Sequence, residues 1–386
     1  MAVLFTRAFA LRPLPLLIAL TLLSAAILAA CDPATPPAAP AAPPSQPTVD
    51  EILALDQAQS EGEVTPAPEV EAAPQPDPDQ EDPPEPAAPA VEALVFVEPQ
   101  QVRQGMSFLV VVDSPNAGAA SVALEGAFLS FIREGGRLFT ILPVDAEAPL
   151  GPLSLLISIA DGEGRPALTV ELEIEVLPAN WPVEVVEIDD ENSRLLDPEV
   201  IAEDLAVRSG VQFSKSPVRL WSGFFRPPTA GVITSTFGVR RSYNFAEPVD
   251  YHTGMDHAGA LGELVVAPNN GIVAWTGETE RRGRGVIIDH GGGLFTTYWH
   301  LSSISAEEGN PINRGDVLGR IGSTGLSTGP HLHWEVVVHG VAVDPIQWIR
   351  EQEVPDPSAQ FDPSQAIYRT EGAVDDTPTG AATDSG

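Results

Sequence analysis

The chain has 386 residues, with 20 lysines and arginines against 54 aspartates and glutamates, and a formal net charge of −34. This balance argues against a nucleic-acid partner, because binding to phosphates requires clustered lysine and arginine. The only cysteine, Cys31, excludes an intramolecular disulfide. The length predicts two or three folded parts rather than one.

The N-terminus has the pattern of an export signal. Arg7 and Arg12 precede an apolar run over 14–30, which ends in Leu-Ala-Ala-Cys at Cys31. A basic start, an apolar stretch and small residues before a cleavage point are typical of secretory signals. The ending resembles a bacterial lipobox, which implies a lipoprotein signal peptide over 1–30 and lipidation of Cys31. The alternative is an uncleaved transmembrane anchor, but a run of about 17 residues is short for spanning a bilayer.

Two segments carry most of the negative charge. Residues 32–92 hold 14 acidic residues, 16 of the 39 prolines and no lysine or arginine, and residues 351–386 hold eight acidic residues and one arginine. Both segments are poor in large apolar side chains, so they cannot bury enough surface to offset chain entropy. We therefore predict a disordered tether over 31–92, beginning at the acylated cysteine, and a disordered acidic tail over 351–386.

Residues 93–178 have the pattern of short strands separated by turns. In the last of them Val170, Leu172, Ile174 and Val176 alternate with polar residues, as expected for a strand with one buried face. We expect strands at 94–97, 108–112, 121–124, 128–132, 138–142, 153–159 and 167–176. Seven short strands in this length favour an immunoglobulin-like β-sandwich. Because the region has no histidine or cysteine, we interpret it as a spacer or docking module rather than a catalytic domain.

Residues 179–224 connect this region to the next. The segment Asp197–Gly210 is predicted to be a helix, since Asp197-Pro198 is a typical start and Gly210 a typical end. We expect Trp221, Phe224 and Phe225 to be buried against the domain that follows.

Residues 225–350 are again rich in strand patterns and in glycine, which predicts an antiparallel β domain. Only a short helical turn is expected, at Pro345–Ile349. The expected strands are 231–237, 264–267, 271–278, 285–290, 294–300, 317–321, 331–339 and 341–343.

All seven histidines lie between positions 252 and 339. On an extended chain residues two and four apart share a face, so His252 lies on the same face as Asp256, and His331 on the same face as His333. Each pair by itself is also compatible with incidental surface polarity. Catalytic zinc sites combine three protein ligands with one open position. His252, Asp256 and one histidine of the 331/333 pair would supply those ligands and leave the other histidine as a general base. His300 is a further candidate for proton transfer.

Several motifs in a fixed order resemble the lysostaphin/LytM-type M23 zinc metallopeptidases over residues 225–350. They are Gly231-Val-Ile-Thr-Ser-Thr-Phe-Gly238, Arg240-Arg241, His252-Thr-Gly-Met-Asp256, Val286-Ile-Ile-Asp-His290, Tyr298-Trp-His-Leu301 and Gly322-Ser-Thr-Gly-Leu-Ser-Thr-Gly-Pro-His-Leu-His-Trp-Glu335. The resemblance implies a twisted antiparallel sheet with a substrate groove and zinc on its floor. It also implies a cell-wall endopeptidase that cleaves peptide stems or cross-bridges of peptidoglycan.

Carried over to this chain, the resemblance assigns one zinc ion to His252, Asp256 and His333. It makes His331 the general base, while His300 orients water or, when protonated, stabilises the transition state. This agrees with the chemistry, because zinc acidifies a bound water and polarises a carbonyl, and a neutral imidazole accepts the released proton.

The other polar residues of this region receive structural interpretations. We expect His257 to be structural or on the surface, His290 to belong to a turn, and His339 to be solvated. Glu335 shares a face with His331 and His333. It is either a partner that orients an imidazole or, as the simpler interpretation, a surface carboxylate at a strand end.

The resulting hypothesis is a lipid-anchored, extracytoplasmic zinc metalloendopeptidase that acts on peptidoglycan peptides. It contacts the membrane through the lipid on Cys31, with cell-division and wall-synthesis proteins as candidate partners. The main alternative is a catalytically inactive relative that regulates or scaffolds other wall hydrolases, and a third is a wall-binding lipoprotein. The presence of all five site residues favours the enzyme.

Overall fold

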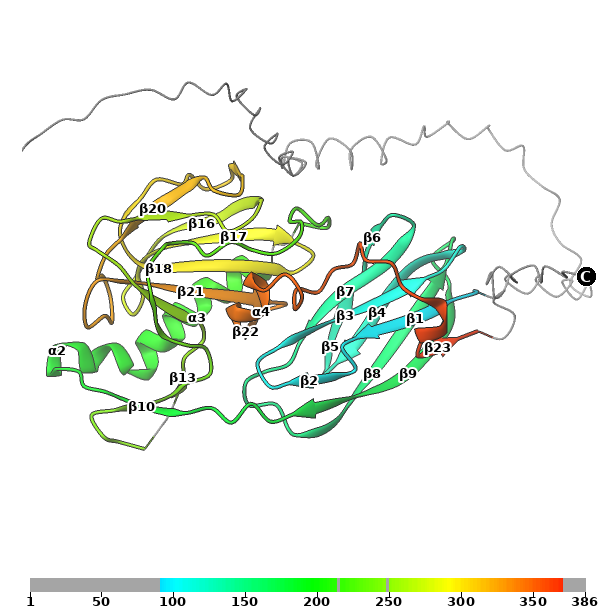
Figure 1. Cartoon of the computed structure of the whole chain (residues 1–386), viewed down its shortest axis with the longest axis horizontal. Coiled ribbons are helices and arrows are strands. Elements are labelled where there is room, and N and C mark those ends of the chain that lie inside the picture. The colour runs from blue at the N-terminus through cyan, green and yellow to red at the C-terminus, as the bar shows by residue number, and fades with distance from the viewer. Residues whose placement is uncertain (1–90, 214–215, 248–249, 371–386) are drawn as a thin grey trace, which may run out of the picture. The chain divides into compact units, whose positions relative to one another are not determined.

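The computed structural model describes residues 91–213, 216–247 and 250–370, which form a mainly β structure (Figure 1). The predicted signal peptide, the lipidation site at Cys31, the tether up to residue 90 and the tail from residue 371 lie outside these residues. Within the described part of the chain no helix has the length and apolar character needed to cross a bilayer.

The first folded region contains two five-stranded sheets. The order in one sheet is β23-β1-β3-β7-β6 and in the other β2-β9-β8-β4-β5. Described pairs in both sheets are antiparallel except β2 with β9, which is parallel. The strands of the first sheet are β1 (Leu94–Glu98), β3 (Ser107–Asp113), β6 (Ile132–Glu134), β7 (Arg137–Pro143) and β23 (Tyr368–Arg369). Those of the second are β2 (Gln101–Arg103), β4 (Ala117–Leu124), β5 (Ala127–Ser130), β8 (Gly151–Asp161) and β9 (Pro166–Leu177).

One hydrophobic core lies between these two sheets. On β9, Val170, Ile174 and Val176 are buried while the glutamates between them are exposed, which confirms the predicted alternation. They join Val110 of β3 and Ile157 of β8 in the same cluster, so the inward faces of both sheets contribute to it. This is the pattern that strands with one buried face produce when two sheets pack together.

The prediction of a disordered tail is wrong for residues 351–370. This segment contains the 3₁₀ helix η2 (Pro363–Gln365) and strand β23, which pairs antiparallel with β1. Phe361 is buried, and its ring centroid lies 5.2 Å from that of Phe96. The acidic composition suggested disorder, but the segment also contains a few apolar side chains. These bury enough surface to hold the segment on the first sheet.

The connector contains more structure than one helix. Its elements are β10 (Val183–Val186), α2 (Asp190–Ser193), the 3₁₀ helix η1 (Arg194–Leu196) and α3 (Pro198–Phe213). Helix α3 confirms the helix predicted at 197–210. Trp221 and Phe225 are buried as expected and both pack against Trp348. Phe224 was also expected to be buried, but 37 % of it is exposed, and the Arg314 guanidinium lies over its ring.

The second folded region is built on a ten-stranded antiparallel sheet, which confirms the predicted class. Its main order is β11-β14-β21-β18-β17-β16-β19; β15 pairs with β20, β20 with β18, and β22 with β21. The strands are β11 (Ile233–Ser235), β14 (Met255–Ala258), β15 (Leu264–Val266), β16 (Gly271–Thr279), β17 (Gly283–Gly291), β18 (Leu294–Ile304), β19 (Pro311–Ile312), β20 (Val317–Ile321), β21 (His331–Val338) and β22 (Val341–Val343).

Three smaller elements complete this region. Strands β12 (Arg240–Tyr243) and β13 (Asp250–Tyr251) form a three-stranded sheet with β10, in which β10 and β12 are parallel. The connector therefore adds a strand beside the second region. Helix α4 (Pro345–Ile349) confirms the short helical turn predicted there, and the Asp344 carboxylate caps its N-terminus.

His290 is a buried structural histidine of this sheet. Its Nδ1–H donates to the Asn270 carbonyl, and Nε2 lies 2.8 Å from Thr296 Oγ1. Burial lowers the pKa of His290 to about 4. An unfolded histidine titrates near pH 6.5, so below that pH the unfolded chain binds a proton that the folded chain does not.

We predict that this group alone reduces the free energy of unfolding by about 3 kcal/mol as the pH falls from 6.5 to 4. The His290→Gln variant should lack this component and show a shallower decline. Urea denaturation of the metal-free wild type and variant at pH 7.0, 5.5 and 4.0 measures the difference. Parallel declines in the two proteins would contradict the assignment.

Candidate metal centre

Neighbouring strands bring the predicted ligands together. Asp256 on β14 lies opposite His333 on β21, and His333 lies opposite Trp299 on β18. His300 is the residue after Trp299, so it lies at the same end of the sheet. His252 precedes β14, and its backbone N–H donates to the Val239 carbonyl at 2.8 Å. Any Cβ on Gly254 would lie 2.4 Å from the Trp334 carbonyl oxygen. Only glycine therefore allows the 252–256 segment to approach β21 this closely.

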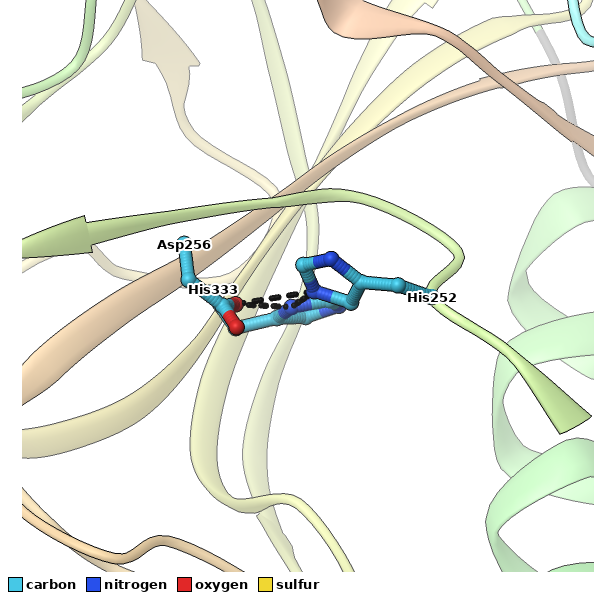
Figure 2. A group of neighbouring side chains, drawn as sticks. All are labelled: His252, Asp256 and His333. Carbon is cyan, nitrogen blue, oxygen red and sulfur yellow. Dashed lines mark hydrogen bonds and ion pairs between the residues drawn. The ribbon is translucent and has the colours of Figure 1, made fainter. Parts of the chain in front are cut away.

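Three ligand atoms converge at this point (Figure 2). Asp256 Oδ1 lies 2.9 Å from His252 Nε2 and 2.7 Å from His333 Nδ1, and the two nitrogens are 2.9 Å apart. His252, Asp256 and His333 are 2 %, 8 % and 5 % exposed. The cluster is thus almost fully removed from water, although it consists of polar groups.

The protonation of the two imidazoles indicates what the cluster binds. His252 Nδ1 lies 2.8 Å from the Thr236 carbonyl oxygen, and His333 Nε2 lies 3.2 Å from Glu335 Oε1. Both partners can only accept hydrogen bonds, so those two nitrogens carry the protons. His252 Nε2 and His333 Nδ1 are then bare, and they face each other and a carboxylate oxygen without a hydrogen between them. Such a set of acceptors is stable around a cation, and two nitrogens and one oxygen suit zinc.

The ionisation of these groups supports the same conclusion. Burial lowers the pKa of His252 to about 4, more than the Asp256 charge raises it, so the ring is neutral at pH 7. Arg241 Nη2 donates to the second oxygen, Asp256 Oδ2, at 2.9 Å and leaves Oδ1 for the metal. The His252 ring is therefore deprotonated without a metal, as metal binding requires.

His331 lies beside the three ligands with a free acceptor. Its Nδ1–H donates to the Gly329 carbonyl at 2.8 Å, and its Nε2 lies 3.9 Å from Asp256 Oδ1. An imidazole held at one nitrogen in this way presents the other nitrogen as a base. The geometry suits the role predicted for His331.

His300 joins the same cluster, and its ring centroid lies 4.7 Å from that of His331. It is buried at a φ of +64°, and its Nδ1 lies 2.7 Å from the Thr324 carbonyl oxygen. Burial lowers its pKa well below the usual range. Neutral His300 has a bare Nε2 and accepts rather than donates. The geometry thus favours the water-orienting role over a protonated, oxyanion-stabilising one.

The remaining histidines lie outside this cluster. His257 is buried, its ring lies 6.2 Å from Trp334, and its Nδ1 contacts the Gly231 carbonyl at 3.3 Å. His290 is buried in the sheet rather than held only by a turn. His339 is half-buried with Nε2 3.3 Å from Thr140 Oγ1, so it is less solvated than expected.

Glu335 differs most from the sequence prediction. It is fully buried, not a surface carboxylate, and it accepts hydrogen bonds from Arg282 Nη1 and Thr297 Oγ1, each at 2.7 Å. Burial alone raises the pKa of Glu335, but Arg282 and Arg208 hold it well below the usual range. The sequence contains one signal of this role, because Glu335 is two residues from His333 in an otherwise apolar strand. Arg241 belongs to the Arg240-Arg241 motif of the family resemblance, whereas Arg282 had no sequence signal, and neither was predicted as a site residue.

Two cavities meet at the cluster. One of about 410 Å³ is lined by Asp256, by Glu184 of β10 and by the 326–331 loop, and another of about 490 Å³ is lined by His252, His333 and Leu205 of α3. Arg241, Tyr243, His300 and Leu326 line both. The candidate ligands therefore border a cavity on each of two sides.

We predict that His333→Ala and Asp256→Ala each abolish stoichiometric zinc binding, because two donors cannot replace three. His331→Ala should still bind one zinc ion per chain, since it removes no ligand. Elemental analysis after dialysis against a micromolar zinc buffer gives the metal content. Full zinc content in His333→Ala would contradict the ligand assignment.

Comparison with known proteins gives a consistent result for the region that contains the cluster. Residues 250–345 match the model of the family described as peptidase family M23. The DD-carboxypeptidase/endopeptidase Mpg of Neisseria meningitidis serogroup B is 41 % identical over 114 residues, which cover 30 % of this chain and 26 % of that protein. The peptidoglycan DD-endopeptidase ShyA of Vibrio cholerae is 35 % identical over 139 residues, covering 36 % and 32 %.

Among solved structures, a Pseudomonas aeruginosa protein that carries the name peptidase M23 aligns with a TM-score of 0.48 and 26 % identity. The alignment covers 63 % of this chain and 93 % of that one. The chain spans only about a quarter to a third of the length of the two curated relatives.

Proposed function

We propose that the chain is a zinc metalloendopeptidase of peptidase family M23, whose model matches residues 250–345, and that it hydrolyses peptide cross-links or stems of bacterial peptidoglycan. The observation that carries the proposal is the convergence of three bare donor atoms, from His252, Asp256 and His333, beside His331 and His300. The names of the two relatives, both described as endopeptidases, support a peptide substrate of the cell wall.

The residues of the site divide the proposed reaction between them. Zinc, when bound, supplies a Lewis acid that polarises the scissile carbonyl and acidifies a water. His331 accepts the proton of that water at Nε2, since its Nδ1–H is engaged by Gly329. The oxygen of the water would form a bond to the carbonyl carbon, and the proton held on His331 would pass to the amine nitrogen as the peptide bond breaks. His300 accepts a hydrogen bond at its bare Nε2 and so orients the water.

The alternative of an inactive regulator or scaffold predicts a damaged ligand set. None of the five positions is altered here, and each imidazole has the partner that fixes its protonation. Two cavities also give access to the cluster. These observations support catalysis over a purely regulatory or wall-binding role.

The segments before the candidate metal centre are proposed to export the protein and anchor it to the membrane. Residues 1–30 direct export and Cys31 carries the lipid, so the protein is extracytoplasmic and anchored in the cell membrane. Residues 31–92 form the tether and 93–178 an immunoglobulin-like spacer, for which the two sheets around one core provide support. Cell-division or wall-synthesis proteins are candidate partners of this spacer.

We predict that the full-length protein with zinc releases muropeptides from purified peptidoglycan. His331→Ala should reduce kcat at least 100-fold while retaining the metal, because general-base catalysis contributes about 10²–10⁴-fold. Chromatography of the soluble products against time measures both rates. Equal rates in wild type and His331→Ala would overturn the mechanism, and absence of products from the zinc-loaded wild type would overturn the function.

A separate prediction concerns the anchor. Cys31→Ser should remove the lipid attachment site, so that the protein is found in the soluble fraction or as the uncleaved precursor. Metabolic labelling with a fatty acid and membrane fractionation measure the change. Labelling of the Cys31→Ser protein equal to that of the wild type would contradict lipidation at this residue.

A further inference from the structure

Helix α3 of the connector inserts a charged residue into the interior beside the metal centre. Asp204 is 2 % exposed, and its Oδ2 accepts from Arg282 Nε at 3.0 Å and from Arg208 Nε at 3.1 Å. Its Oδ1 accepts from Thr279 Oγ1 at 2.8 Å. A buried carboxylate is costly unless it is paired in this way. The helix lies outside residues 250–345, which match the family.

The same arginines reach the residue that orients a metal ligand. Arg282 Nη1 donates to Glu335 Oε1 at 2.7 Å, and Arg208 Nη1 lies 3.5 Å from Glu335 Oε2. Glu335 Oε1 in turn accepts from His333 Nε2 at 3.2 Å. Asp204 of α3 and His333 are therefore connected through only two side chains, Arg282 and Glu335.

Asp204 fixes the positions of both arginines, because it accepts a hydrogen bond from each of them. Arg208 and Arg282 repel each other, and Asp204 and Glu335 are the carboxylates that both contact. Arg282 is fixed at Nε by Asp204, which leaves its Nη1 directed at Glu335. Without Asp204 both guanidinium groups would compete for Glu335 and displace Oε1, the oxygen that accepts the hydrogen bond from His333 Nε2.

We propose that Asp204 and Arg208 of α3 are positioning residues of the zinc site, which act through Arg282 and Glu335 to present the bare Nδ1 of His333 to the metal. The inference rests on the proposed function, in that zinc is bound by His252, Asp256 and His333. It makes the connector helix an integral part of the metal centre, although it supplies no ligand. Partners that orient a ligating histidine typically change metal affinity by about 10–100-fold when removed.

Zinc binding and docking of helix α3 are linked thermodynamically. If docking of α3 strengthens zinc binding, zinc binding must strengthen docking of α3 by the same factor. The amide hydrogens of 200–210 should therefore exchange more slowly in the zinc-bound than in the metal-free protein. A helix that only packs against the domain would show no such difference.

The test measures zinc affinity of the full-length protein by competition with a chromophoric chelator. Asp204→Asn keeps the shape of the side chain but removes its charge, and the zinc Kd should rise 10–100-fold. The matched control is Arg194→Ala, which breaks the exposed Arg194–Glu280 ion pair of the same connector. This control should change the Kd less than threefold. Circular dichroism of each metal-free variant verifies folding.

Two further variants keep the test decisive. Arg208→Ala leaves Asp204 paired with Arg282, so it remains informative if Asp204→Asn does not fold, and it should also raise the Kd at least fivefold. Asp204→Asn combined with Glu335→Gln should raise the Kd less than the product of the single effects, because both act through His333.

The outcomes separate the two proposals. A folded Asp204→Asn or Arg208→Ala protein with wild-type zinc affinity, or unchanged exchange of α3 amides on zinc addition, overturns the positioning role alone. A wild-type protein that binds no zinc overturns the proposed function, and the positioning role with it.

Discussion

The feature on which the rest of the second region depends is the meeting of three hydrogen-bond acceptors without a hydrogen between them. His252 Nε2, His333 Nδ1 and Asp256 Oδ1 lie 2.7–2.9 Å from one another. Each is held by a partner behind it, namely the Thr236 carbonyl, Glu335 and Arg241. Such an arrangement is unfavourable in a folded chain unless a cation relieves it. The close approach at Gly254 and the register of β14 with β21 both serve this contact.

Charge around the centre is balanced locally, in contrast to the chain as a whole. Four arginines form ion pairs there with four carboxylates; the pairs are Arg208 and Arg282 with Asp204 and Glu335, Arg241 with Asp256, and Arg281 with Asp250. The large negative charge is concentrated instead in the tether and the tail. Removing one member of a buried pair leaves its partner uncompensated, which costs far more than the pair contributes when intact. Substitution of Asp204 or Arg208 in the connector would therefore be costly, because each is a member of a buried ion pair.

The sequence predicted the five clustered residues because their spacing places them on shared strand faces and because the motifs follow the order of a known family. It also predicted the long strands and α3, because their hydrophobic periodicity is a local property of the sequence. It missed β12, β13 and β14, since these short strands are defined by pairing with other strands rather than by a pattern of their own. Asp204 was assigned simply to a helix. Its role depends on Arg282, 78 residues away, and no periodicity within the helix reports a contact at that distance. The tail was misjudged because composition averages over a segment and hides single residues such as Phe361.

The pairing of β23 with β1 has a consequence for the edge of the first sheet. Strand β1 reads Leu-Val-Phe-Val-Glu, and its outer edge accepts backbone hydrogen bonds from the C-terminal segment at the carbonyls of Ala93 and Val95. A chain that ended at residue 350, where the family resemblance ends, would leave this apolar strand with an open edge. Such edges recruit strands from other molecules, and natural proteins cover them. Strand β23 thus covers part of an edge that would otherwise be open to pairing with another chain, and the acidic composition around it gives no sign of this contact.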